Sequence, residues 1–419
     1  MNSPTLLAVM STAGAGVPIR ELALLVLVAA SVSYLLTGVV RYAVMRSGWL
    51  AQPRLRDVHD VPKPQLGGLE MFSGILAAVA LASVLPALNR GFPPMTPDMT
   101  AIVAAGVVLL IVGIVDDLYD LDALTKLIGQ VAAALIMSFM GVNWYLLYIP
   151  FGGGSTLILD PILSSVLTVV FTVALINAFN FVDGIDGLAA GLGMIAAGAI
   201  LVYSMVLLHD QGGTVAAYPP AMMSACLFGA CLGFLPHNFE PARIFMGDTG
   251  AMLIGLFLAG ASVSASGRIA PSMYGVADVI ALMSPIVVVV AAISVPMLDL
   301  LLAVVRRVRQ GKSPFSADKM HLHHRLLSMG HSHRRVVLVL YTWVSVVAYA
   351  AVATTVFPAP FVALPSGVLL VFAVVYTAGW ANAKGTFLPV SRRSAGTPDK
   401  LRGSGRGRGR HRSRYNLRP

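Results

Sequence analysis

Long apolar runs dominate this chain and decide what it can fold into. A membrane-spanning helix needs about 20 consecutive, mostly apolar residues, and the sequence holds about eleven such runs. Only 11% of its 419 residues are charged, against roughly 25% in soluble domains. The sequence therefore predicts an all-α, polytopic membrane protein and excludes a soluble enzyme. The runs lie at roughly 21–45, 69–88, 101–115, 127–149, 160–181, 188–208, 214–235, 250–266, 276–305, 336–357 and 361–381.

Lysine and arginine are unevenly divided between the two sides that eleven spans would create. One side would carry only Arg20, Arg90 and Arg268, and the other would carry the remaining loop cations and the basic C-terminus. Because basic loops stay in the cytoplasm, we expect the N-terminus outside and the C-terminus inside. The expected parts are a short extracytoplasmic N-terminus at 1–20, a transmembrane domain at 21–383 and a disordered cytoplasmic tail at 384–419.

The tail carries the whole net charge of +10. Its Gly, Ser and Arg residues cannot bury a core, so we interpret it as an anchor to anionic lipid. RNA binding by its Arg/Gly tract is the alternative, and no nucleic-acid partner is expected.

Acidic residues gather where the third apolar run ends. Asp116, Asp117, Asp120 and Asp122 lie within seven residues, and Lys126 follows. Carboxylates packed so closely repel one another unless a cation or a proton offsets the repulsion, and polar groups at the ends of membrane spans are candidates for function. The cluster therefore predicts a chemical site on the cytoplasmic side.

Two further polar groups lie at span ends on the same predicted side. The first, in the order Asn177, Asn180, Asp183 and Asp186, joins two spans, and glycines allow its backbone to turn tightly and approach a ligand. Asp186 is also a candidate N-cap for the next helix. The second is Phe245-Met-Gly-Asp248-Thr-Gly, in which Asp248 opens another apolar run.

Cationic side chains complete the set. Five of the nine histidines lie between His321 and His333, and Arg325 follows His323 and His324 directly. Because no cysteine is near and basic residues surround them, these histidines fit an oxyanion or diphosphate better than zinc. Lys63 lies between two prolines, whose stiff backbone would hold its ammonium group in place. Carboxylates, amides and cations together favour a divalent metal with phosphates, and the membrane context indicates a lipid substrate.

Five motifs in one order resemble the polyprenyl-phosphate N-acetylhexosamine-1-phosphate transferases. They are Lys63-Pro-x-x-Gly-Gly, Asp116-Asp117-x-x-Asp120, Asn177-x-x-Asn180-x-x-Asp183-Gly-Ile-Asp186-Gly, Phe245-Met-Gly-Asp248-Thr-Gly and His321-Leu-His323-His324. The His-x-His-His form and the number of spans resemble the WecA/TagO branch, and the stretch after Gly330 is most similar to its actinobacterial members. The MraY branch, which takes UDP-MurNAc-pentapeptide, usually has three adjacent histidines and ten spans.

This resemblance implies the reaction of UDP-GlcNAc with a polyprenyl phosphate, decaprenyl or undecaprenyl, to give polyprenyl-diphosphate-GlcNAc and UMP. It would be the first membrane step of a cell-envelope polysaccharide, at the cytoplasmic face of a bacterial plasma membrane, and it would use Mg²⁺ or Mn²⁺. A homodimer is possible in this family. Asp299 matches a Pro-x-x-Asp of the branch and receives no role.

The roles carried over from the motifs are specific. Asp248 and Asn180 would bind the metal, and Asp186 and Phe245 would hold the uracil. Asp117 or its neighbour would deprotonate the lipid phosphate or act as a covalent nucleophile. The remaining candidates would contact the phosphates or the donor: Lys63, Lys126, Asp116, Asn177, Asp183, His321, His323, His324 and Arg325.

Two other classes of protein remain as alternatives. Intramembrane aromatic prenyltransferases also use Asp-rich motifs with Mg²⁺ and diphosphate, but they have about nine spans and no histidine loop. A transporter should place its acids near the middle of the bilayer and often has internal repeats, whereas the acids here lie at span ends. A further alternative keeps the same reaction but uses a different donor, either another UDP-HexNAc or UDP-MurNAc-pentapeptide.

Overall fold

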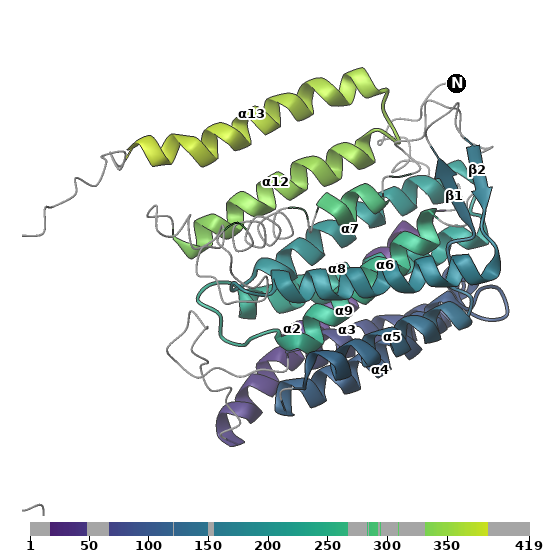
Figure 1. Cartoon of the computed structure of the whole chain (residues 1–419), viewed down its shortest axis with the longest axis horizontal. Coiled ribbons are helices and arrows are strands. Elements are labelled where there is room, and N and C mark those ends of the chain that lie inside the picture. Colours follow the sequence, from purple (N-terminus) through teal and green to yellow (C-terminus); the bar gives the residue numbers. More distant parts are fainter. Residues whose placement is uncertain are drawn as a thin grey trace, which may run out of the picture.

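The computed structural model describes residues 17–47, 67–119, 121–149, 155–266 and 332–383, with a few single or short stretches between 283 and 309. The helices lie side by side in one bundle (Figure 1). The expected tail, most of the run at 276–305 and several candidate site residues lie outside the described residues. The helices are α2 (Ile19–Ser47), α3 (Gly67–Val84), α4 (Asp98–Tyr119), α5 (Ala123–Phe139), α6 (Pro161–Val182), α7 (Leu188–Asp210), α8 (Tyr218–Asn238), α9 (Gly247–Ser266), α12 (His333–Ala353) and α13 (Ala359–Ala383), with short 3-10 turns η1 (Asn89–Gly91) and η2 (Val215–Ala217).

The polytopic membrane architecture is confirmed. Within the described residues, 8 helices are long and apolar enough to cross a membrane, and α5 and part of α13 are shorter apolar helices. Every expected run from 21–45 to 250–266 contains one of them, as do the two runs after residue 332. The count of eleven and the sides on which the two ends lie stay predictions.

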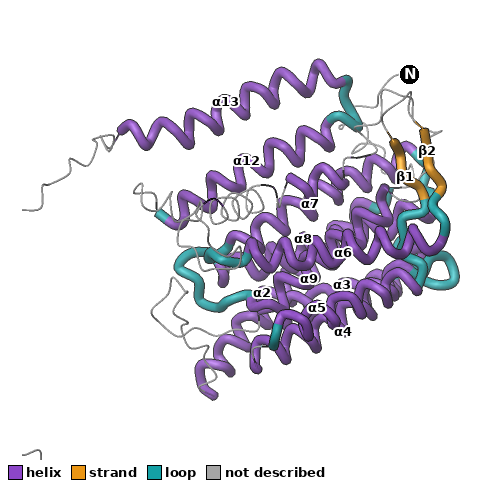
Figure 2. Tube along the Cα trace, viewed as in Figure 1, coloured by secondary structure: helices purple, strands orange, loops and turns teal. Residues whose placement is uncertain are grey.

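The run expected at 127–149 is wrong in its second half. Helix α5 ends at Phe139, and the chain then forms a hairpin of β1 (Leu146–Ile149) and β2 (Ser155–Ile158) at one end of the bundle (Figure 2). Ser138 donates to the side-chain oxygen of Asn143 at 2.5 Å, and the Asn143 amide donates back to the Ser138 carbonyl at 2.7 Å. These bonds turn the chain away from the helix, and a short apolar run does not by itself distinguish a strand from a helix.

Helix α9 is the centre of the bundle. It packs against α3, α4, α6, α7 and α8, and each of its residues is buried except Asp248. In lipid, helices associate through close packing of small residues because the hydrophobic effect does not draw them together. The small residues of α9, which include four glycines, four alanines and three serines, suit that position. Asp248 is therefore the one residue through which this central helix reaches the surface of the bundle.

Candidate active site at one end of the bundle

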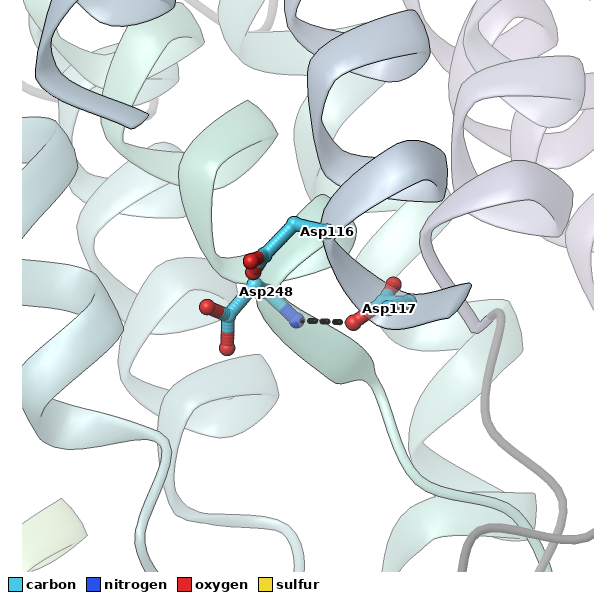
Figure 3. A group of neighbouring side chains, drawn as sticks. All are labelled: Asp116, Asp117 and Asp248. Carbon is cyan, nitrogen blue, oxygen red and sulfur yellow. Dashed lines mark hydrogen bonds between the residues drawn. The ribbon is translucent and has the colours of Figure 1, made fainter. Parts of the chain in front are cut away.

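Three aspartates meet where α4 ends and α9 begins. Asp116 and Asp117 lie in the last turn of α4, and Asp248 lies in the first turn of α9 (Figure 3). One carboxylate oxygen from each lies within 4.8 Å of the others. The structure thus brings together two motifs that the sequence placed 131 residues apart.

Close packing between the two helices makes this meeting possible. Gly113 of α4 lies against Thr249 of α9 so closely that a Cβ at residue 113 would lie 2.6 Å from the Cα of Thr249. A larger residue at 113 would push the helices apart, one turn before the acidic pair. The glycine in the α4 run therefore sets the spacing of the site.

Asp117 binds the first turn of α9. Its Oδ1 accepts the main-chain N–H of Asp248 at 3.0 Å, and its Oδ2 accepts the hydroxyl of Thr249 at 2.7 Å. Gly247 has φ +72, and a Cβ there would lie 2.6 Å from Oδ2 of Asp117. A carboxylate at a helix N-terminus satisfies free N–H groups and suits the positive end of the helix dipole. Both oxygens of Asp117 are therefore engaged in holding α9.

Lys126 of α5 joins the other two carboxylates. Its ammonium nitrogen lies 2.7 Å from Oδ2 of Asp116 and 2.7 Å from Oδ2 of Asp248. Asp116 is buried, and its Oδ1 also accepts the N–H of Leu121 at 2.9 Å. A cation between two carboxylates offsets their mutual repulsion, which is the arrangement that the acidic cluster required.

Asn180, at the end of α6, adds an amide to the cluster. Its Nδ2 lies 3.5 Å from Oδ2 of Asp248. Carboxylate and amide oxygens are hard ligands of the kind that Mg²⁺ takes in proteins. The donor set fits a magnesium ion, and Asn180 needs only to present its oxygen in place of its nitrogen.

The turn between α6 and α7 lies beside this cluster. Burial, followed by the charges of Asp248, Asp117 and Asp186, raises the pKa of Asp183 to about 8. The sequence position of Asp186 favoured it as the N-cap of α7, and this prediction is wrong. The cap is Gly187, and Asp186 instead accepts the N–H of Ala242 at 2.9 Å, because the α8–α9 segment folds over it.

Two other candidates from the sequence occupy different positions. Asn177 lies one turn inside α6 and donates to Oε1 of Gln130 at 2.6 Å, which joins α6 to α5. Asp122 caps α5 and is fully exposed, and hydrogen bonds from Thr125 lower its pKa. It therefore does not join the three aspartates, although it lies in the same acidic segment.

The Phe245 segment docks on the start of α3. The carbonyl groups of Phe245 and Met246 accept the N–H groups of Gly67 and Gly68 at 3.1 and 3.0 Å. Gly67 and Gly68 are the last two residues of the Lys63 motif, so the end of that motif lies beside the Phe245 motif. Several candidates lie outside the described residues: Lys63, Asp120, Asp299, His321, His323, His324 and Arg325.

The sequence reasoning missed three residues around the site. Thr249 bonds Asp117, Gln130 bonds Asn177, and Asn238 accepts the N–H of Gly187 at 3.0 Å. Gln130 carried a signal, since it is polar within an apolar run and one turn after Lys126. Asn238 likewise ends an apolar run. Thr249 lies within the quoted Asp248 motif, but no role was assigned to it, because a threonine in an apolar helix usually bonds its own backbone.

Comparison with known proteins agrees with this geometry. Residues 99–266, which contain the three aspartates, match the family described as Glycosyl transferase family 4. The chain is 55% identical over 377 residues to decaprenyl-phosphate N-acetylglucosaminephosphotransferase of Mycolicibacterium smegmatis, covering 90% of this chain and 92% of that protein. The corresponding Mycobacterium tuberculosis protein is 55% identical over 388 residues, with 92% and 93% covered. A probable undecaprenyl-phosphate N-acetylglucosaminyl 1-phosphate transferase of Bacillus subtilis is 35% identical over 312 residues, with 73% and 77% covered.

Proposed function

This chain belongs to the polyprenyl-phosphate N-acetylglucosamine-1-phosphate transferases, and on that premise we propose its donor, acceptor and site. It transfers N-acetylglucosamine-1-phosphate to a polyprenyl phosphate. The donor is UDP-GlcNAc and the preferred acceptor is decaprenyl phosphate, since the 55% identical relatives are named for that lipid. The products are polyprenyl-diphosphate-GlcNAc and UMP.

The observation that carries this proposal is the cluster of Asp116, Asp117 and Asp248 around Lys126 at one end of the bundle. In the reaction an oxygen of the lipid phosphate attacks the β-phosphorus of the donor. The bond from that phosphorus to the bridging oxygen breaks, and UMP leaves with the oxygen. Such a transfer needs positioning and charge neutralisation more than covalent chemistry. A half-buried cluster of acids that can hold a cation, beside the ammonium group of a lysine, supplies both.

The metal in this proposal is Mg²⁺, with Mn²⁺ as a substitute. Asp248 and Asn180 hold it, and Asp116 lies near enough to contribute. When bound, the ion neutralises diphosphate oxygens. The ammonium group of Lys126 lies 2.7 Å from a carboxylate oxygen of Asp116 and 2.7 Å from one of Asp248. It is therefore beside the oxygens that would hold the ion, and it would bind a phosphate oxygen of the donor.

The remaining residues have roles suited to their positions. The pair Asp116 and Asp117 takes the proton from the lipid phosphate, and Asp117 also holds Asp248 in place through the N–H of that residue. Asp186 and Phe245 hold the uracil. Asp183 and Asn177 line the donor side, while Lys63, His321, His323, His324 and Arg325 bind the sugar-diphosphate from segments outside the described residues.

The site faces the cytoplasm in this proposal. The segment that leads into α9 bonds the start of α3 through the carbonyl groups of Phe245 and Met246. Helix α3 follows the basic stretch at 46–63, and basic loops stay in the cytoplasm. UDP-sugars are cytoplasmic substrates, which agrees with this orientation. A homodimer is compatible with the apolar faces that α2 and α13 present.

Product analysis tests the proposal. Purified protein is incubated with UDP-GlcNAc, UDP-GalNAc or UDP-MurNAc-pentapeptide and with decaprenyl or undecaprenyl phosphate, and UMP and the lipid product are resolved. We expect UMP and lipid-diphosphate-GlcNAc from UDP-GlcNAc, and much less or none from an Asp248→Ala variant at the same Mg²⁺ concentration. Release of UMP from another donor alone would change the substrate, and release from none would contradict the proposed reaction.

A further inference from the structure

Tyr341 reaches from α12 to the turn that begins α7. Its hydroxyl donates a hydrogen bond to the carbonyl of Gly187. Its ring lies on Gly191, one turn later, where a methyl group would overlap the phenol. Helix α12 is thus attached to the turn by one polar and one packing contact from the same side chain.

The N–H of the same glycine is held by α8. The side-chain oxygen of Asn238 accepts the N–H of Gly187 at 3.0 Å, and the Asn238 amide donates to the carbonyl of Ile244 at 3.0 Å. Gly187 has φ +79, a conformation that other residues rarely adopt. Its N–H is therefore held from α8 and its carbonyl from α12, which leaves little freedom for the turn.

The turn carries two of the acids that lie near the aspartate cluster. Asp186, directly before Gly187, binds the α8–α9 segment through the N–H of Ala242. Asp183 is the C-cap of α6 and follows by three residues Asn180, whose amide nitrogen lies 3.5 Å from Oδ2 of Asp248. A shift of Gly187 would move both acids relative to the cluster.

We propose that Tyr341 is a positioning residue for the donor nucleotide, which fixes the Asp183–Gly187 turn through the carbonyl of Gly187. The inference rests on the proposed function, in which Asp186 holds the uracil. Tyr341 acts through the turn and not on the reacting atoms. Removing its hydroxyl should weaken binding of UDP-GlcNAc and leave binding of the lipid acceptor unchanged.

The same helix offers a matched control. Tyr349 lies two turns after Tyr341 and packs its hydroxyl on α7 in a similar way, since a Cβ at Gly198 would lie 2.8 Å from that oxygen. Gly198 is eleven residues beyond Gly187, or about 16 Å along the helix. A Tyr349→Phe change therefore removes a comparable hydroxyl between α12 and α7 without touching the turn.

The experiment compares Tyr341→Phe and Tyr349→Phe with the wild type in the same detergent. We measure kcat, KM for UDP-GlcNAc, KM for decaprenyl phosphate and the rise in melting temperature that UDP-GlcNAc induces. Tyr341→Phe should raise KM for UDP-GlcNAc about three- to tenfold, as expected for one lost hydrogen bond, and should reduce the induced rise. Tyr349→Phe should change both by less than about twofold.

The outcomes separate this inference from the function on which it rests. An active wild type with a Tyr341→Phe variant that binds UDP-GlcNAc as tightly as Tyr349→Phe overturns the positioning role alone, even if the variant is less stable. An equal rise in KM for the lipid also overturns it, because general loosening would affect both substrates. A wild type that releases no UMP from UDP-GlcNAc contradicts the proposed function, and the induced rise in melting temperature still decides whether Tyr341 supports nucleotide binding.

Discussion

The carboxylate of Asp117 accepts the main-chain N–H of Asp248 at 3.0 Å, across 131 residues of chain. The end of one helix thereby fixes the start of another, and the bond to the Thr249 hydroxyl strengthens the attachment. Asp117, one of the two aspartates that the sequence suggests as a proton acceptor, thus also holds in place the metal-ligand candidate Asp248. The two roles predict different consequences when Asp117 is changed.

Asp117→Asn should lower turnover by at least about 10²-fold, the scale on which general-base catalysis operates. The asparagine amide keeps one oxygen acceptor and replaces the other with an NH₂ donor. One of the two bonds to Asp248 and Thr249 is therefore lost, and Asp248 should shift. If support of Asp248 is the larger part of its role, the variant will need more Mg²⁺ for half-maximal turnover. If proton acceptance is the larger part, kcat will fall at an unchanged Mg²⁺ requirement. Turnover of a well-folded Asp117→Asn near the wild-type value would remove the residue from the mechanism.

The control for that variant lies five residues away. Asp122 caps α5 with its side chain fully exposed, and asparagine is as good an N-cap as aspartate. Asp122→Asn should therefore leave both turnover and the Mg²⁺ requirement unchanged. A large loss in this variant would mean that charge anywhere in the acidic segment matters, rather than the contacts of Asp117.

The pKa of about 8 for Asp183 predicts how stability depends on pH. Because the pKa of Asp183 in the folded state lies above the ordinary aspartate value of 3.8, folding favours the protonated acid. Its contribution is fully present below about pH 4 and is lost as pH rises through about 8. In EDTA, the melting temperature of the wild type should fall more between pH 5 and 8.5 than that of Asp183→Asn. Parallel curves for the two proteins would show that Asp183 ionises without cost in the folded state.

The basic tail should be dispensable for the chemistry. It holds the whole net charge and none of the five motifs, and the last described helix, α13, ends at Ala383. A chain that ends near residue 384 should keep its kcat and KM in detergent, where no anionic bilayer surface is present to bind the tail. Collapse of turnover in a correctly folded truncated protein would show that the tail contributes to the site.

The spans and motifs were predictable from the sequence because apolar runs of about 20 residues have one solution in a membrane. The hairpin at Leu146–Ile158 was not, because its reversal depends on side-chain bonds between Ser138 and Asn143. The ordering of motifs predicted that Asp117 and Asp248 belong to one site. It did not predict that Asp117 would bind the backbone of Asp248, or that Asp186 would bind Ala242 in place of capping α7. Those contacts depend on helix packing that no local pattern encodes.

Asp248 and Asn180 should determine the metal requirement. Their oxygen and amide groups come from different helices, at the N-terminus of α9 and near the C-terminus of α6. One carboxylate and one amide leave most of the coordination shell to phosphate oxygens and water, as Mg²⁺ prefers. The ion should therefore bind weakly alone and tightly with UDP-GlcNAc, and Asp248→Ala should raise the Mg²⁺ requirement or abolish turnover.

A Mg²⁺ titration of turnover measures this effect, with His324→Ala as the contrasting variant. The histidine is proposed to bind the sugar-diphosphate, so its loss should raise KM for UDP-GlcNAc at an unchanged Mg²⁺ requirement. Asn180→Ala should lie between the two, since the amide is a neutral ligand and water replaces it at a smaller cost. An active Asp248→Ala whose Mg²⁺ curve matches that of the wild type would place the metal elsewhere, on Asp116 and its neighbours at the end of α4.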